Sequence, residues 1–553
     1  MTLQSSDKRS PSLLDASSEV FVHDLAALSP TDATAWGISG FEGELQDFSP
    51  DYWNAIAERN RDMVADVDAF DDGTDDNDDE EDFDDVDRVT ADVLRDRVCL
   101  DLALHHQGET LASLNNIDSP VQTIRDTFLI MPRETDDDVE NLRERLSRVP
   151  DALHGYCESL AEAASQGHVA AARQVEEVVS QCEDLADEDS VLQHLGLDEH
   201  DPVVVEAQEA FARVAGWLAE QLAPHAPHED AVGRDRYEMF SHLHVGEFVD
   251  LDEAYQWSLE QLRDIDAQQL QVAQQLYGPG TTIREAMKKL NADERYLIRG
   301  TDALQEWMQK TADQAIADLD GVSFNIPEQA RQVECLIDPA GTGGIFYTPP
   351  SDDFSRPGRM WWSVPKTQEV FHTWQELTTV FHEGVPGHHL QISQTLVEKD
   401  LNLWRRVACW NSGHGEGWAL YAESLMKELG YHEDPGNLMG YLDAQRLRAA
   451  RVAIDIGIHL NKRNPECTGL WDASYARSFL RENTSMNEDA LYFELNRYLG
   501  WPGQAASYAI GQRLWLNLRD EAISQGQTLA QFHSKALSYG SIPMGILRDQ
   551  VLN

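Results

Sequence analysis

The chain has 553 residues, of which 43 are basic and 98 are acidic, so its formal net charge is −55. With 42% hydrophobic and 25% charged residues, the composition is typical of a folded protein rather than of a disordered or fibrous chain. A surface this negative repels phosphate backbones and anionic lipid head groups. We therefore expect neither nucleic acid nor a membrane among its partners.

Three features favour a cytoplasmic location. The sequence contains no run of about 18 apolar residues, so we expect no membrane span. The first residues, Met1 to Leu14, include Ser, Asp, Lys and Arg where a secretory signal would need an apolar stretch. The six cysteines lie far apart without a CxxC pair, which is typical of free, buried thiols in a cytoplasmic chain of this size.

Residues 1–100 are predicted to form an N-terminal helical segment that could serve as a lid or appendage. This segment contains an acidic run from Asp66 to Asp87, with 14 acidic residues and no basic one. Such a run is typical of a solvated insertion, and we predict that residues 66–87 are disordered. A role in cation binding or partner docking is the less favoured interpretation.

Residues 101–332 have the pattern of a helical region. Apolar residues recur three and four positions apart, as in Val204 to Leu222 and Leu251 to Tyr277. Breaks that divide the region into helices of ordinary length fall at Pro150, Pro224 to Pro227, Gly278 to Gly280, and Pro327.

The pattern changes between Val333 and Val364, where glycines and prolines alternate with aromatic and β-branched residues. This predicts a short sheet or hairpin with loops. A helical pattern resumes at Thr367, with interruptions at Pro386-Gly387 and at Asn411 to Gly417. We predict a mainly α fold with a small β element, in which residues 333–553 form one continuous unit with residues 101–332.

The segment FHEGVPGHHLQ, from Phe381 to Gln391, concentrates imidazole and carboxylate groups. A zinc hydrolase needs three protein ligands, an open position for water, and a carboxylate that takes the proton of that water. His382 can be a ligand and Glu383 the base, as in a helix with the HExxH motif.

The strict HExxH spacing is absent, because Pro386 stands four residues after His382. On an uninterrupted helix His389 would return to the face of His382, but about 10.5 Å further along the axis. A proline here favours a kink or bulge. Two looped residues could bring His388 into place instead, so we favour His388 over His389 as the ligand, with the other histidine as a neighbouring or substrate contact.

A second candidate segment is GHGEGWALYAE, from Gly413 to Glu423. Glycines before a helical stretch allow tight backbone geometry, and Glu416 is placed like a third metal ligand at a helix start. Glu423 lies seven residues later on the same helix face, so either carboxylate could ligate; we favour Glu416. Without a metal, both glutamates would instead pair with arginines such as Arg405.

A third group, Arg448, Arg451, Asp455 and His459, recurs at three- and four-residue steps and so shares one helix face. Structural ion pairing is the favoured interpretation. If the face lines a cleft, Arg448 or Arg451 could hold a substrate carboxylate through paired hydrogen bonds. Asp455 or His459 could then orient the metal ligands.

Four motifs in this order resemble the bacterial domain-of-unknown-function family numbered 885. They are HEGVPGHHLQ (His382–Gln391), EGWALYAE (Glu416–Glu423), RLRAARVAIDIGIH (Arg446–His459) and PGQAASYAIGQ (Pro502–Gln512). The family in turn distantly resembles the gluzincin zinc metallopeptidases, a mostly helical class. The resemblance extends from about Leu13 to the C-terminus and implies a large helical body with a small β element and a deep cleft.

The resemblance also implies roles for single residues. Glu416 in EGWA is similar to the ligand glutamate in the EGFA stretch of aminopeptidases. Tyr508 is similar in order to tyrosines that donate a hydrogen bond to a developing oxyanion. The loop that begins at Tyr347 matches the family pattern, and in HExxH relatives a strand beside the metal helix binds extended substrate backbone. Trp361 and Trp362, which follow this loop, could line an apolar wall but fit a core position better.

Together these features predict a zinc-dependent hydrolase that cuts a peptide or other amide bond in a small substrate, with one zinc ion held by His382, His388 and Glu416. The predicted catalytic residues are Glu383 as the base and Tyr508 or His459 at the oxyanion, and the predicted substrate contacts are Arg448, Arg451, Tyr347 and His389. One alternative is a metal-dependent hydrolase of a non-peptide amide or ester. The other is a non-catalytic helical binding protein whose histidines form a satisfied polar core.

Overall fold

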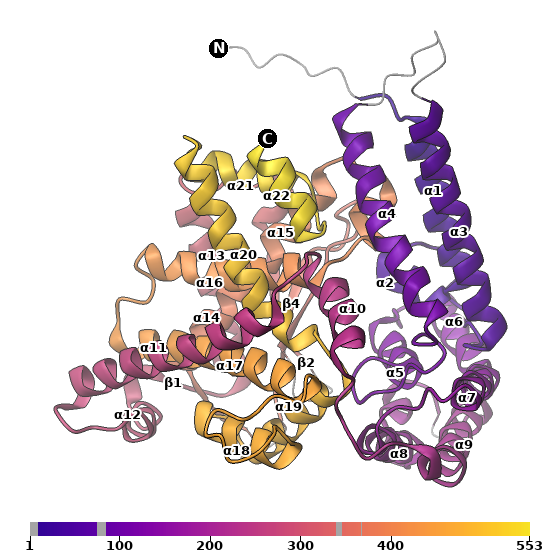
Figure 1. The fold of residues 1–553 in the computed structure, drawn as a ribbon, viewed down its shortest axis with the longest axis horizontal. Helices are drawn as coiled ribbons and strands as arrows, with labels where there is room; N and C mark the ends of the chain where they lie inside the picture. Colours follow the sequence, from indigo (N-terminus) through magenta and orange to yellow (C-terminus); the bar gives the residue numbers. More distant parts are fainter. Residues whose placement is uncertain (1–8, 74–83, 199, 339–344, 366–367) are drawn as a thin grey trace. The chain divides into compact units, whose positions relative to one another are not determined.

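The computed structural model describes residues 9–73, 84–198, 200–338, 345–365 and 368–553 (Figure 1). Helices account for 68% of the residues and strands for 5%, which confirms the predicted mainly α fold with a small β element. The chain divides into two compact units, residues 1–230 with 399–408 and residues 231–398 with 409–553. The boundary lies just after the predicted break at Pro224 to Pro227, and it does not coincide with the segment ends that we predicted at residues 100 and 332.

The first unit is helical in its described part, and proline is the first or second residue of α2, α5, α7 and α9, where its missing N–H costs nothing. Its core contains the buried rings of Phe128, Tyr156 and Phe211. The elements are α1 (Leu13–Leu28), α2 (Pro30–Trp36), α3 (Pro50–Gly73), α4 (Asp85–His106), α5 (Pro120–Ile130), α6 (Asp136–Ser147), α7 (Val149–Ser165), α8 (Ala172–Ala186), η1 (Val191–His194), α9 (Pro202–Trp217), η2 (Leu218–Leu222), η3 (Ala223–His225) and η6 (Trp404–Ala408).

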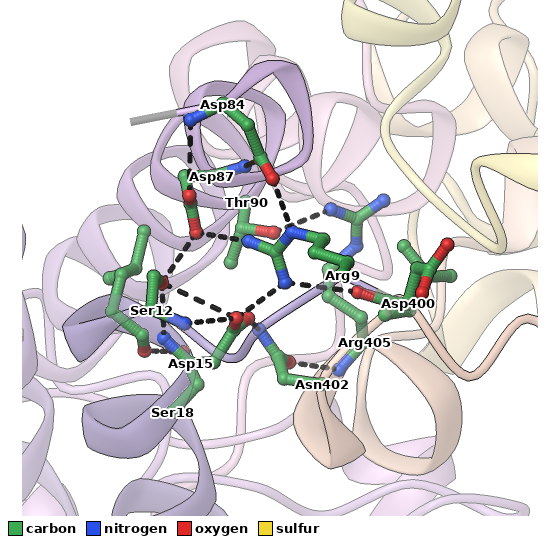
Figure 2. A network of polar contacts seen from close by, with 12 residues as sticks. Arg9, Ser12, Asp15, Ser18, Asp84, Asp87, Thr90, Asp400, Asn402 and Arg405 are labelled. Carbon is green, nitrogen blue, oxygen red and sulfur yellow. Dashed lines mark hydrogen bonds and ion pairs between the residues drawn. The ribbon is translucent and has the colours of Figure 1, made fainter. Parts of the chain in front are cut away.

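The ends of the acidic run are helical, contrary to the predicted disorder of residues 66–87. Residues 66–73 continue α3, and Asp84 caps α4 by accepting a hydrogen bond from the backbone N–H of Asp87. Acidic side chains stabilise a helix N-terminus because they satisfy free N–H groups and complement the helix dipole. Arg9 adds ion pairs to Asp15, Asp84 and Asp87 (Figure 2). The remaining part of the predicted insertion, 74–83, lies outside the described residues.

The second unit contains the helices of the C-terminal half and the β elements. Its core is built where α11, α17, α19 and α20 bury their apolar faces against one another. The helices are α10 (Arg234–Val245), α11 (Leu251–Tyr277), α12 (Ile283–Leu290), η4 (Glu294–Tyr296), α13 (Thr301–Leu319), η5 (Glu328–Arg331), α14 (Thr373–Glu383), α15 (His388–Val397), α16 (Ser412–Glu428), α17 (Pro435–His459), α18 (Ala473–Asn483), α19 (Glu488–Gly500), α20 (Gln504–Ser524), α21 (Leu529–Ser538) and α22 (Met544–Leu552).

The predicted β element is a three-stranded sheet in the order β2-β4-β3, where β2 (Val333–Asp338) runs parallel to β4 (Gly358–Ser363) and β3 (Ile345–Thr348) runs antiparallel to it. On β4, Trp362 is buried in the core, as the favoured interpretation had it, whereas Trp361 points to the other side of the strand and is only partly buried. A second, unpredicted pair joins β1 (Leu297–Arg299) to β5 (Val370–His372).

Two further sequence predictions bear on the fold. All six cysteines are free thiols, as predicted, but the predicted burial holds only for Cys182, Cys335 and Cys409, because Cys99 and Cys467 are exposed and Cys157 is partly buried. Among the helices that the structure describes, none combines the length and the apolar composition needed to cross a bilayer. The deep cleft stays a prediction.

Candidate metal centre

The break predicted at Pro386-Gly387 separates α14 from α15 and brings their ends close together. α14 ends at Glu383, and α15 begins at His388. The turn between them is tight: the N–H of Gly387 donates to the carbonyl of Phe381, and a Cβ on Gly387 would lie 1.9 Å from the carbonyl oxygen of His382. Only glycine fits at this position, so the turn depends on the residue that follows the proline.

This turn places His382 and His388 beside Glu416 of α16. Nε2 of His382 lies 3.4 Å from Oε2 of Glu416, and Nε2 of His388 lies 3.5 Å from the same oxygen. The ligand atoms of all three residues lie within 4.8 Å of one another. Both histidines are buried, with exposed fractions of 5% and 7%. The structure thus brings together the three residues that the sequence predicted as metal ligands.

Glu423 does not belong to this group of ligand atoms but contacts the other ring nitrogen of His382, Nδ1. Its Oε1 lies 2.8 Å from Nδ1 of His382, and Thr378 donates a 2.7 Å hydrogen bond to its Oε2. A carboxylate at Nδ1 keeps a proton on that nitrogen, so Nε2, which faces Glu416, is the atom that would bind a metal. Glu416 and Glu423 are therefore engaged by histidines and a threonine rather than by the arginines of the alternative interpretation.

Charge is concentrated at this cluster. Burial lowers the pKa of His382, but the neighbouring carboxylates of Glu416 and Glu423 outweigh burial and raise it to about 10. Burial likewise raises the pKa of Glu416, yet the two histidines outweigh it and hold the value well below the ordinary range. The carboxylates thus favour a positive charge at the histidines, and a bound cation could supply that charge instead.

A further buried carboxylate, Glu383, directly follows His382 at the end of α14. Burial raises its pKa above the ordinary value, against the attraction of His382 and His388. These electrostatic interactions indicate that Glu383 lies near the candidate ligands. A buried carboxylate with a raised pKa beside a metal-binding cluster suits proton transfer.

The predicted placement of Glu416 at a helix start needs correction. α16 begins at Ser412, where the side chain of Asn411 accepts a hydrogen bond from the N–H of His414, so Glu416 lies in the second turn. The helix contains glycines because neighbouring elements approach it so closely that there is no room for a Cβ. A Cβ on Gly417 would lie 2.5 Å from the carbonyl carbon of Gly511 on α20.

Tyr508 on α20 is partly buried and lies within electrostatic reach of Glu416. Burial is the main cause of its raised pKa, and the negative charge of Glu416 is the next. Arg497 donates a 3.2 Å hydrogen bond to its hydroxyl oxygen, which leaves the O–H free to donate elsewhere. Tyr508 is thus available as a hydrogen-bond donor near the cluster.

The polar stripe on α17 separates into two parts. Arg451 pairs with Glu494 at 2.9 Å and donates to the hydroxyl of Tyr498, and His459 is fully buried with Nε2 2.8 Å from the carbonyl oxygen of Tyr498. These contacts match the favoured interpretation of structural pairing, and the structure does not bring Arg451 or His459 into the ligand cluster. A role for His459 at an oxyanion has no support in these contacts.

Arg448 is different. It donates only a long hydrogen bond, 3.5 Å, to the carbonyl of Ala444 on its own helix, and within the described part of the chain its buried Nε has no hydrogen-bond partner. Its charge acts on Glu383 and Glu423, where it lowers the pKa of each against the effect of burial. Arg448 therefore lies near the cluster with a guanidinium that is not neutralised by an ion pair.

His389 and Tyr347 form a contact between β3 and α15. The hydroxyl of Tyr347 lies 2.8 Å from Nδ1 of His389, and Nε2 of His389 lies 3.0 Å from the carbonyl oxygen of Ala330. A carbonyl accepts only, so Nε2 carries the proton and Nδ1 accepts from Tyr347. Burial lowers the pKa of His389 to about 4, which keeps the ring neutral. Both nitrogens are thus committed away from Glu416.

Two residues near the site, Thr378 and Trp410, were not predicted from the sequence. Thr378 lies one helical turn before His382, and this i−4 spacing is a signal that could have identified it. Trp410 is 46% exposed and its ring centroid lies 6.3 Å from that of His388. No local pattern distinguishes it from the other tryptophans of the chain.

The fold resembles two solved structures. One, from Colwellia psychrerythraea, is 21% identical with a TM-score of 0.82 and covers 98% of each chain. The other, from Shewanella oneidensis, is 17% identical with a TM-score of 0.72 and covers 98% of this chain and 100% of that one. Among proteins with curated descriptions, none matches this sequence.

These comparisons contradict the predicted cytoplasmic location. Both solved structures are described as a "putative lipoprotein", a term for membrane-anchored proteins. The prediction depended on the composition of Met1 to Leu14 and on the spacing of the cysteines, and neither property identifies how a protein is anchored. Residues 30–551 match the family described as "Bacterial protein of unknown function (DUF885)", and the chain belongs to this family.

Proposed function

We propose that this chain is a zinc-dependent hydrolase that cleaves a peptide or other amide bond in a small substrate. The observation that carries the proposal is the convergence of His382, His388 and Glu416, each from a different helix, with ligand atoms within 4.8 Å of one another. Two imidazoles and one carboxylate are a ligand set of catalytic zinc sites, in which the fourth position is left for water or substrate.

The distances of the two histidine nitrogens from Glu416 fit a zinc site. Bonds of about 2.0–2.1 Å in tetrahedral geometry put neighbouring ligand atoms about 3.3 Å apart. The separations from Glu416 Oε2 to the two histidine nitrogens, 3.4 and 3.5 Å, are close to this value. Within the described residues this oxygen has no hydrogen-bond partner, although it is buried. A buried acceptor that faces two imidazoles is accounted for by a shared cation.

Zinc, when bound, polarises the scissile carbonyl and lowers the pKa of water. Glu383 would take the proton from the attacking water and pass it to the leaving amine, a role that its raised pKa favours. Tyr508 would donate its O–H to the developing oxyanion, since Arg497 already occupies the acceptor side of this hydroxyl. Arg448, which has no carboxylate partner, would bind a substrate carboxylate.

This assignment also supports the finer resemblance to gluzincin peptidases. In both, a ligand histidine is followed directly by the glutamate base, and a later helix supplies a glutamate ligand. The second histidine differs, because His388 comes six residues after His382 and starts a separate helix. The turn at Gly384 to Gly387 takes the place of a continuous metal-binding helix.

The first experiment is zinc analysis of untagged protein by mass spectrometry. We expect about one zinc ion per chain in the wild type and a large loss in Glu416→Gln, which removes the shared ligand charge without changing its size. Glu428→Gln is the matched control, because Glu428 lies on the same helix but pairs at the surface with Arg519. Equal zinc content in all three proteins would refute the metal site.

The second experiment tests catalysis with a panel of short peptides, amides and esters. Glu383→Gln should retain zinc but lose cleavage by several orders of magnitude, because the amide cannot accept the proton. Unchanged cleavage in this variant would remove Glu383 as the base. Zinc bound without cleavage of any substrate in the wild type would refute the hydrolase proposal while leaving the metal site in place.

A further inference from the structure

Trp410 is an exposed aromatic residue beside the candidate metal centre. It lies two residues before α16 and is 46% exposed. Its ring centroid is 6.3 Å from that of His388, with an angle of 51° between the ring planes. An indole of this exposure leaves much of its apolar surface in water, next to one of the three candidate ligands.

The backbone on both sides of Trp410 is fixed. The thiol of Cys409 donates to the carbonyl of Ser541 at 3.1 Å, and the N–H of Asn411 donates to the hydroxyl of the same serine at 3.0 Å. The side chain of Asn411 also caps α16. Trp410 is therefore presented from an anchored segment rather than from a loose loop.

The indole itself rests on the backbone of α16. A Cβ on Gly415 would lie 2.2 Å from Cη2 and 2.4 Å from Cζ2 of Trp410, so only glycine allows the ring to lie there. Gly415 directly precedes Glu416 in the sequence. The six-membered ring of the indole is thus supported by the helix that carries the candidate ligand glutamate, and the ring needs little further ordering to bind a partner.

We infer that Trp410 is a substrate-binding residue that contacts an apolar, preferably aromatic, side chain next to the scissile amide. This inference rests on the proposed function and adds a substrate class to it. Stacking on a fixed indole, taken without the area that it buries, corresponds to a preference of up to about tenfold for an aromatic over a methyl side chain.

The test measures binding as well as cleavage. The probes are phenylalanine hydroxamate and alanine hydroxamate, which share a zinc-binding group and differ in the side chain, and the readout is the ratio of their Kd values by calorimetry on zinc-loaded protein. The wild type should bind the phenylalanine probe about tenfold more tightly. Trp410→Ala should reduce the ratio to near one, and Trp410→Phe should restore part of it.

Phe493→Ala is the matched control, because Phe493 on α19 is exposed to nearly the same extent, 45%. It should keep the wild-type ratio. The same ratios of kcat/KM should be seen with peptide substrates that carry phenylalanine or alanine beside the cleaved bond.

The inference is overturned if Trp410→Ala keeps the wild-type ratio, or if Phe493→Ala loses it to the same extent. Failure of the proposed function has a different signature: the zinc-loaded wild type then cleaves no peptide, amide or ester of the panel. A wild type that cleaves its substrates with no preference between phenylalanine and alanine refutes the role of Trp410 alone.

Discussion

Gly417→Ala tests the packing that positions the candidate ligand Glu416. Helix propensity alone favours alanine over glycine by about 1 kcal/mol in a helix interior. The added Cβ, however, would lie 2.5 Å from the carbonyl carbon and 2.7 Å from the Cα of Gly511 on α20. Carbon atoms in good contact are about 3.5–4.0 Å apart, so the two backbones would have to separate by about 1 Å.

The contact cannot relax through a flexible side chain, because the nearest atoms belong to the backbone. The approach is also reciprocal, since a Cβ on Gly511 would lie 2.3 Å from the carbonyl oxygen of Gly413. Overpacking of this kind costs about 1–3 kcal/mol, and the upper end applies where both partners are backbone. After the propensity gain, we expect Gly417→Ala to lower the free energy of unfolding by about 2 kcal/mol.

The assay is denaturant unfolding followed by tryptophan fluorescence, with the midpoint compared at constant slope. The control is Gly545→Ala on α22, where the nearest atom to the new Cβ is 3.5 Å away and the contact is ordinary. Gly545→Ala should be neutral or slightly stabilising. If Gly417→Ala is as stable as this control, the close approach of α16 to α20 is refuted, and with it our explanation for the glycines of this helix.

Four further outcomes follow from single contacts. Gly216→Ala in α9 should stabilise the first unit by about 1 kcal/mol in thermal unfolding, because nothing lies within 4 Å of its Cβ position; a loss would contradict that open space. Burial raises the pKa of Glu494, but two arginines outweigh it and lower the pKa to about 2, so about 3 kcal/mol of stability should be lost as the pH falls from about 4.5 to about 2. Glu494→Gln should flatten this acid limb in unfolding curves measured across that range, and an unchanged limb would exclude the ion pairs as its cause. Glu423→Gln should weaken zinc binding by about 10–100-fold in chelator competition, since it removes the charge behind the first ligand histidine; wild-type affinity would show that this contact does not orient the ligand. Arg448→Gln should raise KM for substrates with a free carboxylate and leave their amidated forms unchanged, and an equal effect on both forms would argue against the predicted ion pair.

Much of the fold was predictable because its signals are local. The apolar period of three and four residues identifies helices wherever one face is buried, as along α11. The glycine- and proline-rich stretch after Val333 identified the sheet, since strands of this length need turns at their ends. The short β1–β5 pair was missed because three residues carry too little pattern to be read without their partner.

The site was predictable where its residues stand in short motifs, as the three candidate metal ligands do. His382 and Glu383 are neighbours, so their chemistry could be read directly. The roles of Arg451 and His459 depended on what faces α17 from other helices, and there the partners are Glu494 and a backbone carbonyl. The spacing of residues along a helix shows which side chains share a face, but it does not show which residues of other elements pack against that face.

Glycine shows the same limit most clearly. The glycines around Glu416 suggested tight backbone geometry at a helix start, yet they lie inside α16. There, backbone atoms at Gly413 and Gly417 and the indole of Trp410 at Gly415 leave no room for a Cβ. At Gly387 the same absence of a side chain allows a turn instead, because a Cβ would meet the carbonyl of His382. Local sequence indicates that the chain needs a small residue at both places, but only the partner atoms decide whether the result is a turn or a helix crossing. The choice between His388 and His389 has the same origin, since it is the turn at Gly387 that aims one ring at Glu416 and sends the other to Tyr347 and Ala330.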